Sequence, residues 1–203
     1  ALFCNVDKDS VIQSIDASTI YEVPLLMKKE KLDQVVLKKL KISKSSPSDL
    51  SRWISFVNRL KSPKNEIKIG LIGKYVELQD SYKSILESLV HAGSENQTKV
   101  NVVSLHSEHI DSKQIRNVVS KLDGILVAPG FGERGIEGKI QSIKCAREEN
   151  IPFFGICLGM QMAVIEFARN VLNLNNANST EMDPNTKHPI ISLMTDQKDI
   201  IAK

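Results

Sequence analysis

The segment Gly155-Ile156-Cys157-Leu158-Gly159 places a cysteine between two glycines, where the apolar run 152–156 meets a helical pattern that continues to Phe167. A nucleophile on such a strand-to-helix turn forms a nucleophile elbow, here with cysteine in place of serine. The turn pushes the side chain above the sheet edge, and the start of the helix favours the thiolate. The alternative is a structural cysteine buried at a strand end, since free cysteine is often buried. The flanking strand and helix favour the catalytic interpretation.

The chain around this elbow alternates apolar segments with amphipathic ones. We predict strands at residues 67–73, 100–105, 124–128 and 152–156, and helices at 81–90, 110–121, 139–149 and 157–167. Near-continuous apolar strands alternating with helices are typical of a buried parallel sheet. The sequence therefore predicts an α/β fold, a mostly parallel sheet with helices on both faces. Ligands bind such sheets at the carboxyl ends of the strands, where the loops after the third and fourth strands lie.

The first 66 residues have a different pattern. Leu2-Phe3-Cys4 is predicted to end a short buried strand, and residues 20–24 to form an extended piece closed by proline. A Lys-rich helix is expected over residues 25–40. The polar segment 43–47 is the most linker-like part of the chain. A helix over residues 50–60 follows, with Ser48 as its cap and an end near Ser62-Pro63.

Composition narrows the functional classes. The chain has 203 residues, enough for one substantial core or for one domain plus part of another. Of these residues 41% are hydrophobic and 25% charged, which is ordinary for a soluble globular protein. A net charge of +3 with dispersed lysines gives no reason to expect nucleic acid. No apolar run approaches the roughly 20 residues of a membrane span, and the N-terminus has no signal-peptide pattern.

The cysteines and histidines indicate neither a disulfide framework nor a metal site. Three cysteines without a C-x-x-C pair point to a reducing, intracellular compartment. We predict no metal site, because no cluster of ligand residues is present. Cys4 and Cys145 are interpreted as buried structural residues, and the four histidines as surface or loop residues.

A second glycine loop, residues 128–135, follows the third predicted strand. It could supply a second backbone donor to an oxyanion. Alone it would be a plain turn, but the elbow on the adjacent strand favours a functional interpretation. Pro129 has no N–H, so Gly130 would be the donor. The segment Gly70–Lys74 lacks the spacing of a phosphate loop.

The segment Gly155–Gln161 resembles the nucleophile motif of class I glutamine amidotransferases. Within that class the chain is similar to the CTP synthase family, in the blocks Gly73–Leu78, Asp80–Ser84, Gly130–Gly135 and Asn175–Glu181. Leu2–Val6 and Ile20–Pro24 resemble the end of that family's amidoligase domain, so the resemblance covers nearly the whole chain. It implies the tail of an α/β synthetase domain over residues 1–42, an interdomain linker with a helix over 43–66, and a glutaminase domain over 67–203.

The resemblance implies roles for particular residues. Cys157 would attack the side-chain amide of glutamine, leaving a glutamyl thioester and ammonia. The N–H groups of Leu158 and Gly130 would stabilise the oxyanion. Gln161, Glu181 and Phe131 would bind glutamine, with Glu181 against its α-ammonium group.

Further ligands follow from the same resemblance. Phe131 and Arg134 would lie on the loop that responds to GTP, the allosteric activator, and Lys74-Tyr75 would face the ammonia route between domains. The stretch Ile15, Asp16 and Ala17 corresponds to one that contacts ATP, although it departs from the family pattern. ATP and Mg²⁺ would bind in the rest of the synthetase domain. The expected protein is a cytoplasmic homotetramer that acts on glutamine, UTP and ATP to form CTP, without nucleic-acid or membrane partners.

Two departures from the family pattern matter. The family loop reads Pro-Gly-Gly-Phe-Gly, whereas this chain has Ala128-Pro129-Gly130-Phe131-Gly132. The family's catalytic His and Glu occupy a His-Pro-Glu-like segment that we do not find before Lys203, and His188-Pro189-Ile190 is more typical of a strand start. We therefore expect a piece of a longer protein, incomplete at its C-terminus and inactive alone.

Two alternatives remain open from the sequence. One is a triad-lacking, glutaminase-like domain with a regulatory or assembly role. The other is a different class I amidotransferase or a cysteine hydrolase of the same fold, which would leave the amidoligase-like blocks without a reason.

Overall fold

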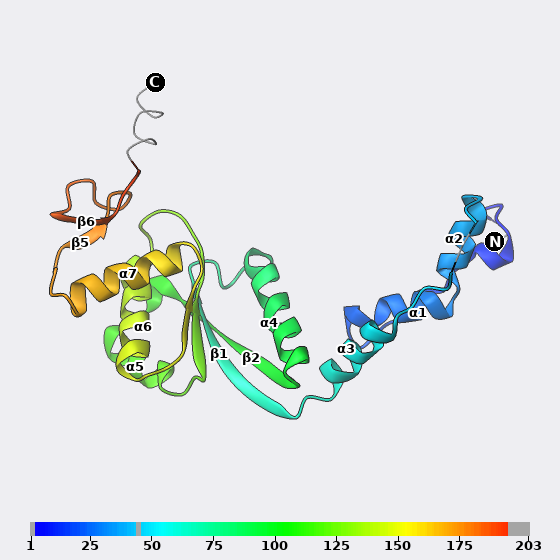
Figure 1. Ribbon diagram of the computed structural model, residues 1–203, viewed down its shortest axis with the longest axis horizontal. Coiled ribbons are helices and arrows are strands. Elements are labelled where there is room, and N and C mark those ends of the chain that lie inside the picture. Colours follow the sequence, from blue (N-terminus) through cyan, green and yellow to red (C-terminus); the bar gives the residue numbers. More distant parts are fainter. Residues whose placement is uncertain (1–2, 44–45, 195–203) are drawn as a thin grey trace, which may run out of the picture.

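The computed structural model describes residues 3–43 and 46–194, which form an N-terminal helical part and an α/β domain (Figure 1). The strands are β1 (Asn65–Gly73), β2 (Thr98–His106), β3 (Gly124–Val127), β4 (Phe153–Gly155), β5 (Ala177–Ser179) and β6 (His188–Ile191). The α-helices are α1 (Val23–Lys29), α2 (Leu32–Lys39), α3 (Ser51–Lys61), α4 (Lys83–Glu95), α5 (Ser112–Val119), α6 (Ile136–Glu148) and α7 (Leu158–Asn170). Short 3₁₀ helices are η1 (Lys8–Ser10), η2 (Ile20–Glu22), η3 (Gln79–Tyr82) and η4 (Ser107–His109).

The main sheet has the order β2-β1-β3-β4, and every neighbouring pair is parallel. Val127 of β3 lies in register with Ile72 of β1 and with Gly155 of β4. The loops that leave β3 and β4 therefore emerge side by side at one edge, as the sequence predicts. A separate pair, β5 and β6, is also parallel.

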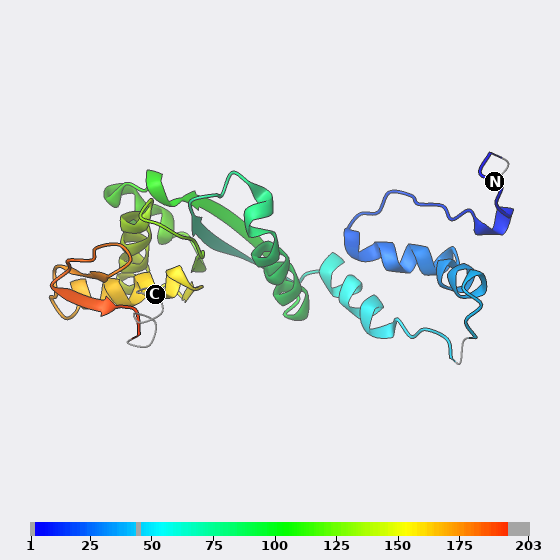
Figure 2. The same cartoon turned by 90° about the horizontal axis from the view of Figure 1, so that it is seen from above.

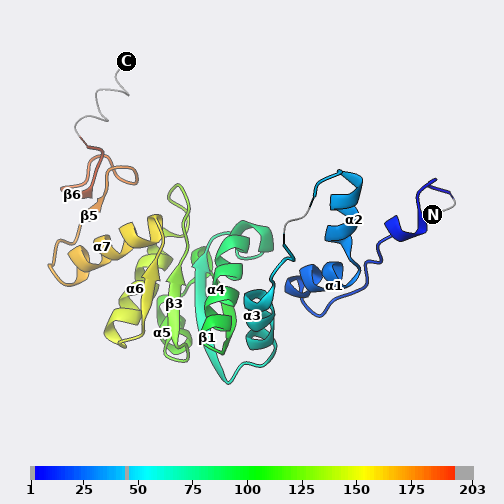
Figure 3. The same ribbon diagram turned by 45° about the vertical axis from the view of Figure 1, so that its right-hand side comes forward.

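Alternating side chains of β1 and β3 build a core on each face of this sheet. Ile72 and Val127 belong to a large cluster that α5, α6 and α7 cover, whereas Leu71 and Leu126 pack against Tyr82 and residues of α4. Figure 3 shows α5 and α6 on one side of β1 and β3, and α4 on the other. The prediction of a parallel sheet with helices on both faces is confirmed.

The N-terminal part meets the α/β domain through four aromatic rings, which we call the junction cluster: Tyr21, Trp53, Phe56 and His91. The rings of Tyr21 and Phe56 pack edge to face with centroids 5.1 Å apart. The indole Nε1 of Trp53 donates to the carbonyl oxygen of Tyr21 at 2.7 Å. Figure 2 shows that α3, which carries Trp53 and Phe56, is the segment that lies between the two parts. The cluster therefore sets how the N-terminal part attaches.

The phenol of Tyr21 is a polar anchor of this junction. Its hydroxyl contacts the carboxylate of Glu87 and lies 2.7 Å from Nε2 of His91, both on α4. Burial, reinforced by Glu87, raises the pKa of Tyr21 to about 12. The hydroxyl therefore stays protonated at neutral pH and can donate to the carboxylate.

Several predictions for the N-terminal part are wrong. Residues 3–5 form a turn in which Phe3 and Cys4 are exposed, so neither the strand nor a buried Cys4 is found, while Leu2 lies outside the described residues. Residues 20–24 are helical, not extended. Thr19 caps this segment by accepting from the backbone N–H of Tyr21, and Pro24 sits in the first turn of α1, where proline is tolerated.

Other boundaries differ in detail. The helix expected over residues 25–40 is broken at Lys31, which has a left-handed backbone with φ of 61°. Ser48 does not cap α3: the N-cap position is Leu50, which has no side-chain cap, and Oδ1 of Asp49 accepts from the N–H of Ser51 at 2.9 Å. The end at Ser62 is confirmed, and the linker-like segment 43–47 falls partly outside the described residues.

Candidate active site

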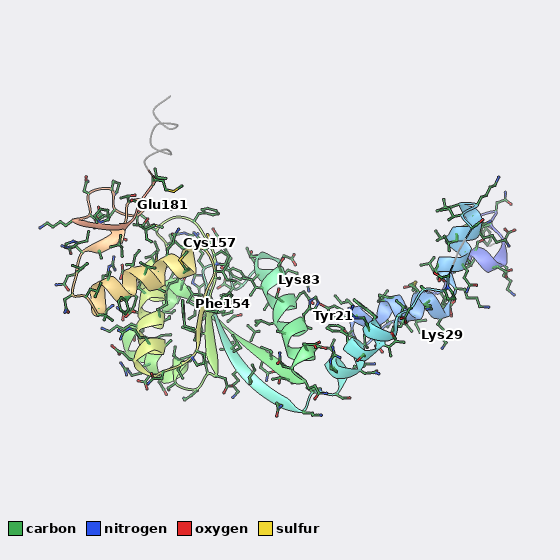
Figure 4. The ribbon with its side chains drawn as sticks, viewed as in Figure 1. Tyr21, Lys29, Lys83, Phe154, Cys157 and Glu181 are labelled. Carbon is green, nitrogen blue, oxygen red and sulfur yellow. The ribbon has the colours of Figure 1, made fainter. Side chains whose placement is uncertain are left out.

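Cys157 forms the turn between β4 and α7. Its backbone has φ of 52° and ψ of −108°, a conformation that a residue with a Cβ rarely adopts and that is common at functional sites. The helix begins at once, and the N–H of Gln161 donates to the carbonyl oxygen of Cys157 at 3.1 Å. The Cys157 side chain is exposed, not buried as a structural cysteine would be. Figure 4 shows it at the start of α7.

The two glycines of the elbow are required by close packing. A Cβ on Gly159 would lie 2.1 Å from the carbonyl oxygen of Val127 in β3, and one on Gly155 would lie 2.6 Å from the carbonyl carbon of Gly159. Either contact is shorter than real Cβ atoms show, so the first turn of α7 packs directly on the end of β3. This packing fixes the position of Cys157 relative to the neighbouring strand.

Two backbone N–H groups lie free near this turn. Leu158 is the first residue of α7, where N–H groups have no acceptor within the helix. Among the described residues, the N–H of Gly130 also has no backbone acceptor. The two residues are neighbours, because a Cβ on Gly130 would lie 3.8 Å from Cδ2 of Leu158. Such a pair of donors beside a nucleophile can hold a negatively charged oxygen.

Two lysines hold the loop that carries Gly130. Nζ of Lys139, on α6, donates to the carbonyl oxygen of Ala128 at 3.0 Å, and Nζ of Lys74, after β1, donates to the carbonyl oxygen of Phe131. Burial lowers the pKa of Lys139 to about 8; the charge of Lys74 acts in the same direction and Cys157 opposes it. The loop of residues 128–135, which we call the oxyanion loop, therefore lies in a positive environment.

Sequence reasoning missed Lys139. The residue lies on the buried face of α6 with Ile136, Ile140 and Ile143. A charged residue at helical spacing within an apolar face is the signal that could have identified it.

The predicted glutamine-binding residues lie on the same side of the domain. Gln161 is half-buried one turn after Cys157. Glu181 is exposed in the turn after β5, where its N–H donates to Oγ of buried Ser179 at 3.2 Å, and Figure 4 shows Glu181 and Cys157 near the same end of α7. Phe131 is 82% exposed on the oxyanion loop.

The remaining predicted residues lie farther from the elbow. Arg134 is exposed near the end of the oxyanion loop, with Nη1 3.4 Å from Oε1 of Glu108. Ile15, Asp16 and Ala17 belong to the N-terminal part, in the segment between η1 and η2. The structure therefore does not bring the predicted ATP contact to the cysteine.

No general base stands beside the cysteine in the described part of the chain. His188 begins β6 and is exposed, and its N–H donates to Oγ1 of Thr186 at 3.3 Å. Within residues 3–43 and 46–194, no histidine is hydrogen-bonded to Cys157, and no group of three or more His, Cys, Asp or Glu could hold a metal ion. The same residues contain no helix long and apolar enough to cross a membrane.

An ion pair between a buried carboxylate and a partly exposed arginine, also missed by sequence reasoning, joins α6 and α7 behind the site. Arg147 of α6 donates from Nη2 to Oε1 of Glu166 at 2.8 Å and from Nε to Oε2 at 3.0 Å. Only 2% of the Glu166 side chain is exposed. This fork-like pair fixes α7, and with it the elbow, against α6.

Residues 77–200 match the family described as glutamine amidotransferase class-I, and residues 1–42 match the family described as CTP synthase N-terminus. This chain belongs to the class-I glutamine amidotransferase family. Within it, the chain is similar in particular to CTP synthases. It is 63% identical over 203 residues to the CTP synthase of Flavobacterium johnsoniae and 56% identical over 209 residues to that of Methanocaldococcus jannaschii. Each match covers 100% of this chain and 38% of the relative.

A solved structure, the glutaminase domain of Trypanosoma brucei CTPS with bound acivicin, has the same fold. Its TM-score is 0.61 at 36% identity, and the match covers 64% of this chain and 51% of that one. The α/β fold derived from the sequence is therefore the glutaminase fold. The chain spans little more than a third of the length of its curated relatives.

Proposed function

We propose that this chain is the glutamine-hydrolysing part of a longer ligase that aminates UTP to CTP. The observation that carries the proposal is the elbow, where an exposed cysteine with a strained backbone lies at a helix start beside two free N–H groups. The family membership supports the substrate, and the similarity to CTP synthases over the whole chain supports the product.

The geometry supports a thioester mechanism. Sγ of Cys157, having lost its proton to a base, attacks the side-chain carboxamide carbon of glutamine. The carbonyl oxygen becomes an oxyanion between the N–H groups of Leu158 and Gly130. The tetrahedral species then collapses, the base returns the proton to the departing nitrogen, and ammonia leaves a glutamyl thioester. Water hydrolyses the thioester to glutamate and restores the thiol.

Binding roles complete this proposal. Glu181 pairs with the α-ammonium group of glutamine, and Gln161 and Phe131 contact the rest of the substrate. We assign the general base to a residue outside the described part of the chain. Arg134, near the exposed end of the oxyanion loop, would take part in the response to GTP.

The longer protein supplies the rest of the reaction. In this proposal residues 1–42 end a synthetase domain, residues 43–66 link the domains, and residues 67–203 form the glutaminase domain. The synthetase domain would use ATP with Mg²⁺ to activate UTP, with Ile15, Asp16 and Ala17 near the ATP site. We further propose that the protein is a cytoplasmic homotetramer.

The test is a comparison of nitrogen sources in the full-length protein. Cys157→Ala is expected to abolish CTP formation from glutamine and to preserve CTP formation from added ammonia. Cys4→Ala is the matched control, because Cys4 is also an exposed free cysteine, and it should keep both activities. Equal loss of both activities in Cys157→Ala would refute the proposed role. An unmodified protein that releases no ammonia from glutamine would favour the regulatory alternative.

A further inference from the structure

Lys139 is a buried cation without a carboxylate partner. Its side chain is 1% exposed in the second turn of α6, and Nζ donates to the neutral carbonyl oxygen of Ala128 at 3.0 Å. No carboxylate of the described residues pairs with it, and the charged groups that influence it are Lys74 and Cys157. Lysine is almost never fully buried unless paired, because removing an ammonium from water is costly. This arrangement is therefore unfavourable for stability, which points to a functional reason for it.

The position of the ammonium indicates what that reason is. Nζ contacts the carbonyl of Ala128 on one side of Pro129, and a Cβ on Gly130, on the other side, would lie 3.6 Å from the same Nζ. Lys139 therefore lies alongside the peptide group that sets the direction of the Gly130 N–H. Lys74 holds a carbonyl three residues further along the loop, that of Phe131.

We propose that Lys139 is a positioning residue for glutamine hydrolysis, which holds the loop so that the Gly130 N–H faces Cys157 and adds positive charge where the oxyanion forms. This inference rests on the proposed function. Because Lys139 is buried and held by the Ala128 carbonyl, its charge needs no rearrangement during the reaction, which strengthens such stabilisation.

The charge is present only while the amine is protonated. The groups that face Lys139 from other elements are Lys74, after β1, and Cys157, at the start of α7. With a pKa of about 8, due first to burial, Lys139 is largely a cation at neutral pH and loses its charge as the pH rises through 8. Glutamine hydrolysis should therefore have an alkaline limb near this pH.

The experiment uses the full-length protein with Lys139→Met and Lys139→Gln. Methionine has a similar length without charge or donor, whereas glutamine keeps a donor for the Ala128 carbonyl. Glutamate release is measured with glutamine, ATP, UTP and GTP present. For Lys139→Met we expect kcat to fall about 100-fold, as for loss of an oxyanion donor, with KM changed less than about threefold. Lys139→Gln should recover part of this loss and lack the alkaline limb.

A melting experiment separates positioning from a merely structural role. Replacing a buried, unpaired cation by an apolar side chain should raise the melting temperature of Lys139→Met while its activity falls. A parental kcat in Lys139→Met, or activity lost together with a lower melting temperature, would overturn the inference. Cys157→Ala distinguishes the two proposals. If Cys157→Ala still hydrolyses glutamine, the proposed function fails. If Cys157→Ala is inactive but Lys139→Met keeps the parental activity, the proposed function stands and the positioning role fails.

Discussion

Gly159→Ala tests whether the elbow is fixed by backbone packing. The added methyl group would lie 2.1 Å from the carbonyl oxygen of Val127, whereas ordinary contact begins at 3.4 Å, so α7 and β3 must separate by 3.4 − 2.1 = 1.3 Å. Because the opposing atom belongs to a strand in the middle of the sheet, it cannot rotate away. Overpacking of this kind costs about 1–3 kcal/mol in the free energy of unfolding. A displacement of about 1 Å at the nucleophile also lowers a rate by about 100-fold.

The stability change is measured by urea denaturation of the chain followed by circular dichroism, and the rate by glutamate release in the full-length protein. The stability control is Gly130→Ala, where the nearest atom to the new Cβ is 3.6 Å away, an ordinary contact. The free energy of unfolding of that variant should lie within about 0.5 kcal/mol of the parental value. If Gly159→Ala matches this control in stability and keeps the parental rate, the packing argument is wrong.

Three further predictions concern the ion pair between α6 and α7, the binding of glutamine and the pH dependence of stability. Arg147→Ala leaves the buried carboxylate of Glu166 without its partner and should lower the free energy of unfolding by about 1.5–3 kcal/mol. Arg116→Ala, which breaks more exposed pairs, should have a clearly smaller effect in the same denaturation assay, and equal effects would contradict this account. Glu181→Ala should raise the KM for glutamine about tenfold or more and change kcat less, since a charged hydrogen bond contributes about 1.5–3 kcal/mol. Lys187→Ala is the control, and an unchanged KM in Glu181→Ala would exclude the contact between Glu181 and glutamine. Folding lowers the pKa of Lys139 to about 8 from 10.5, so between these pH values the unfolded chain binds more protons than the folded one. The free energy of unfolding of the parent, relative to that of Lys139→Met, should therefore rise by about 3 kcal/mol from pH 7 to 10.5. If this difference between the two proteins does not change with pH, Lys139 is not buried as a cation.

The sheet domain could be predicted from the sequence because its strands are strongly apolar. Residues 70–73 and 124–128 are buried on both faces, and the glycines around Cys157 are required by the turn they occupy. In this domain the local sequence preferences agree with the overall fold, and the predicted ends of strands and helices differ from the observed ends by only a few residues. The strand β5 escaped prediction because Ala177–Ser179 is a short, mostly polar segment without alternation.

The structure of the N-terminal part and the burial of Lys139 could not be predicted from the sequence, for different reasons. Residues 20–24 contain β-branched residues and proline, which favour an extended chain, but the Thr19 cap and the packing of Tyr21 favour the helix. For such short segments, tertiary contacts outweigh intrinsic preference. The sequence analysis made no prediction for Lys139, because the contact that explains its burial, with the Ala128 carbonyl, becomes visible only when α6 and the end of β3 are placed together.

The junction cluster also gives this protein a built-in optical probe. Trp53 is the only tryptophan among the 203 residues, and its indole is hydrogen-bonded to Tyr21 where α3 meets the α/β domain. Its fluorescence therefore reports on that contact and not on the surroundings of Cys157. If emission shifts before far-ultraviolet circular dichroism changes, the N-terminal part has separated while the sheet is intact. Coincident changes would show that both parts unfold as one cooperative unit.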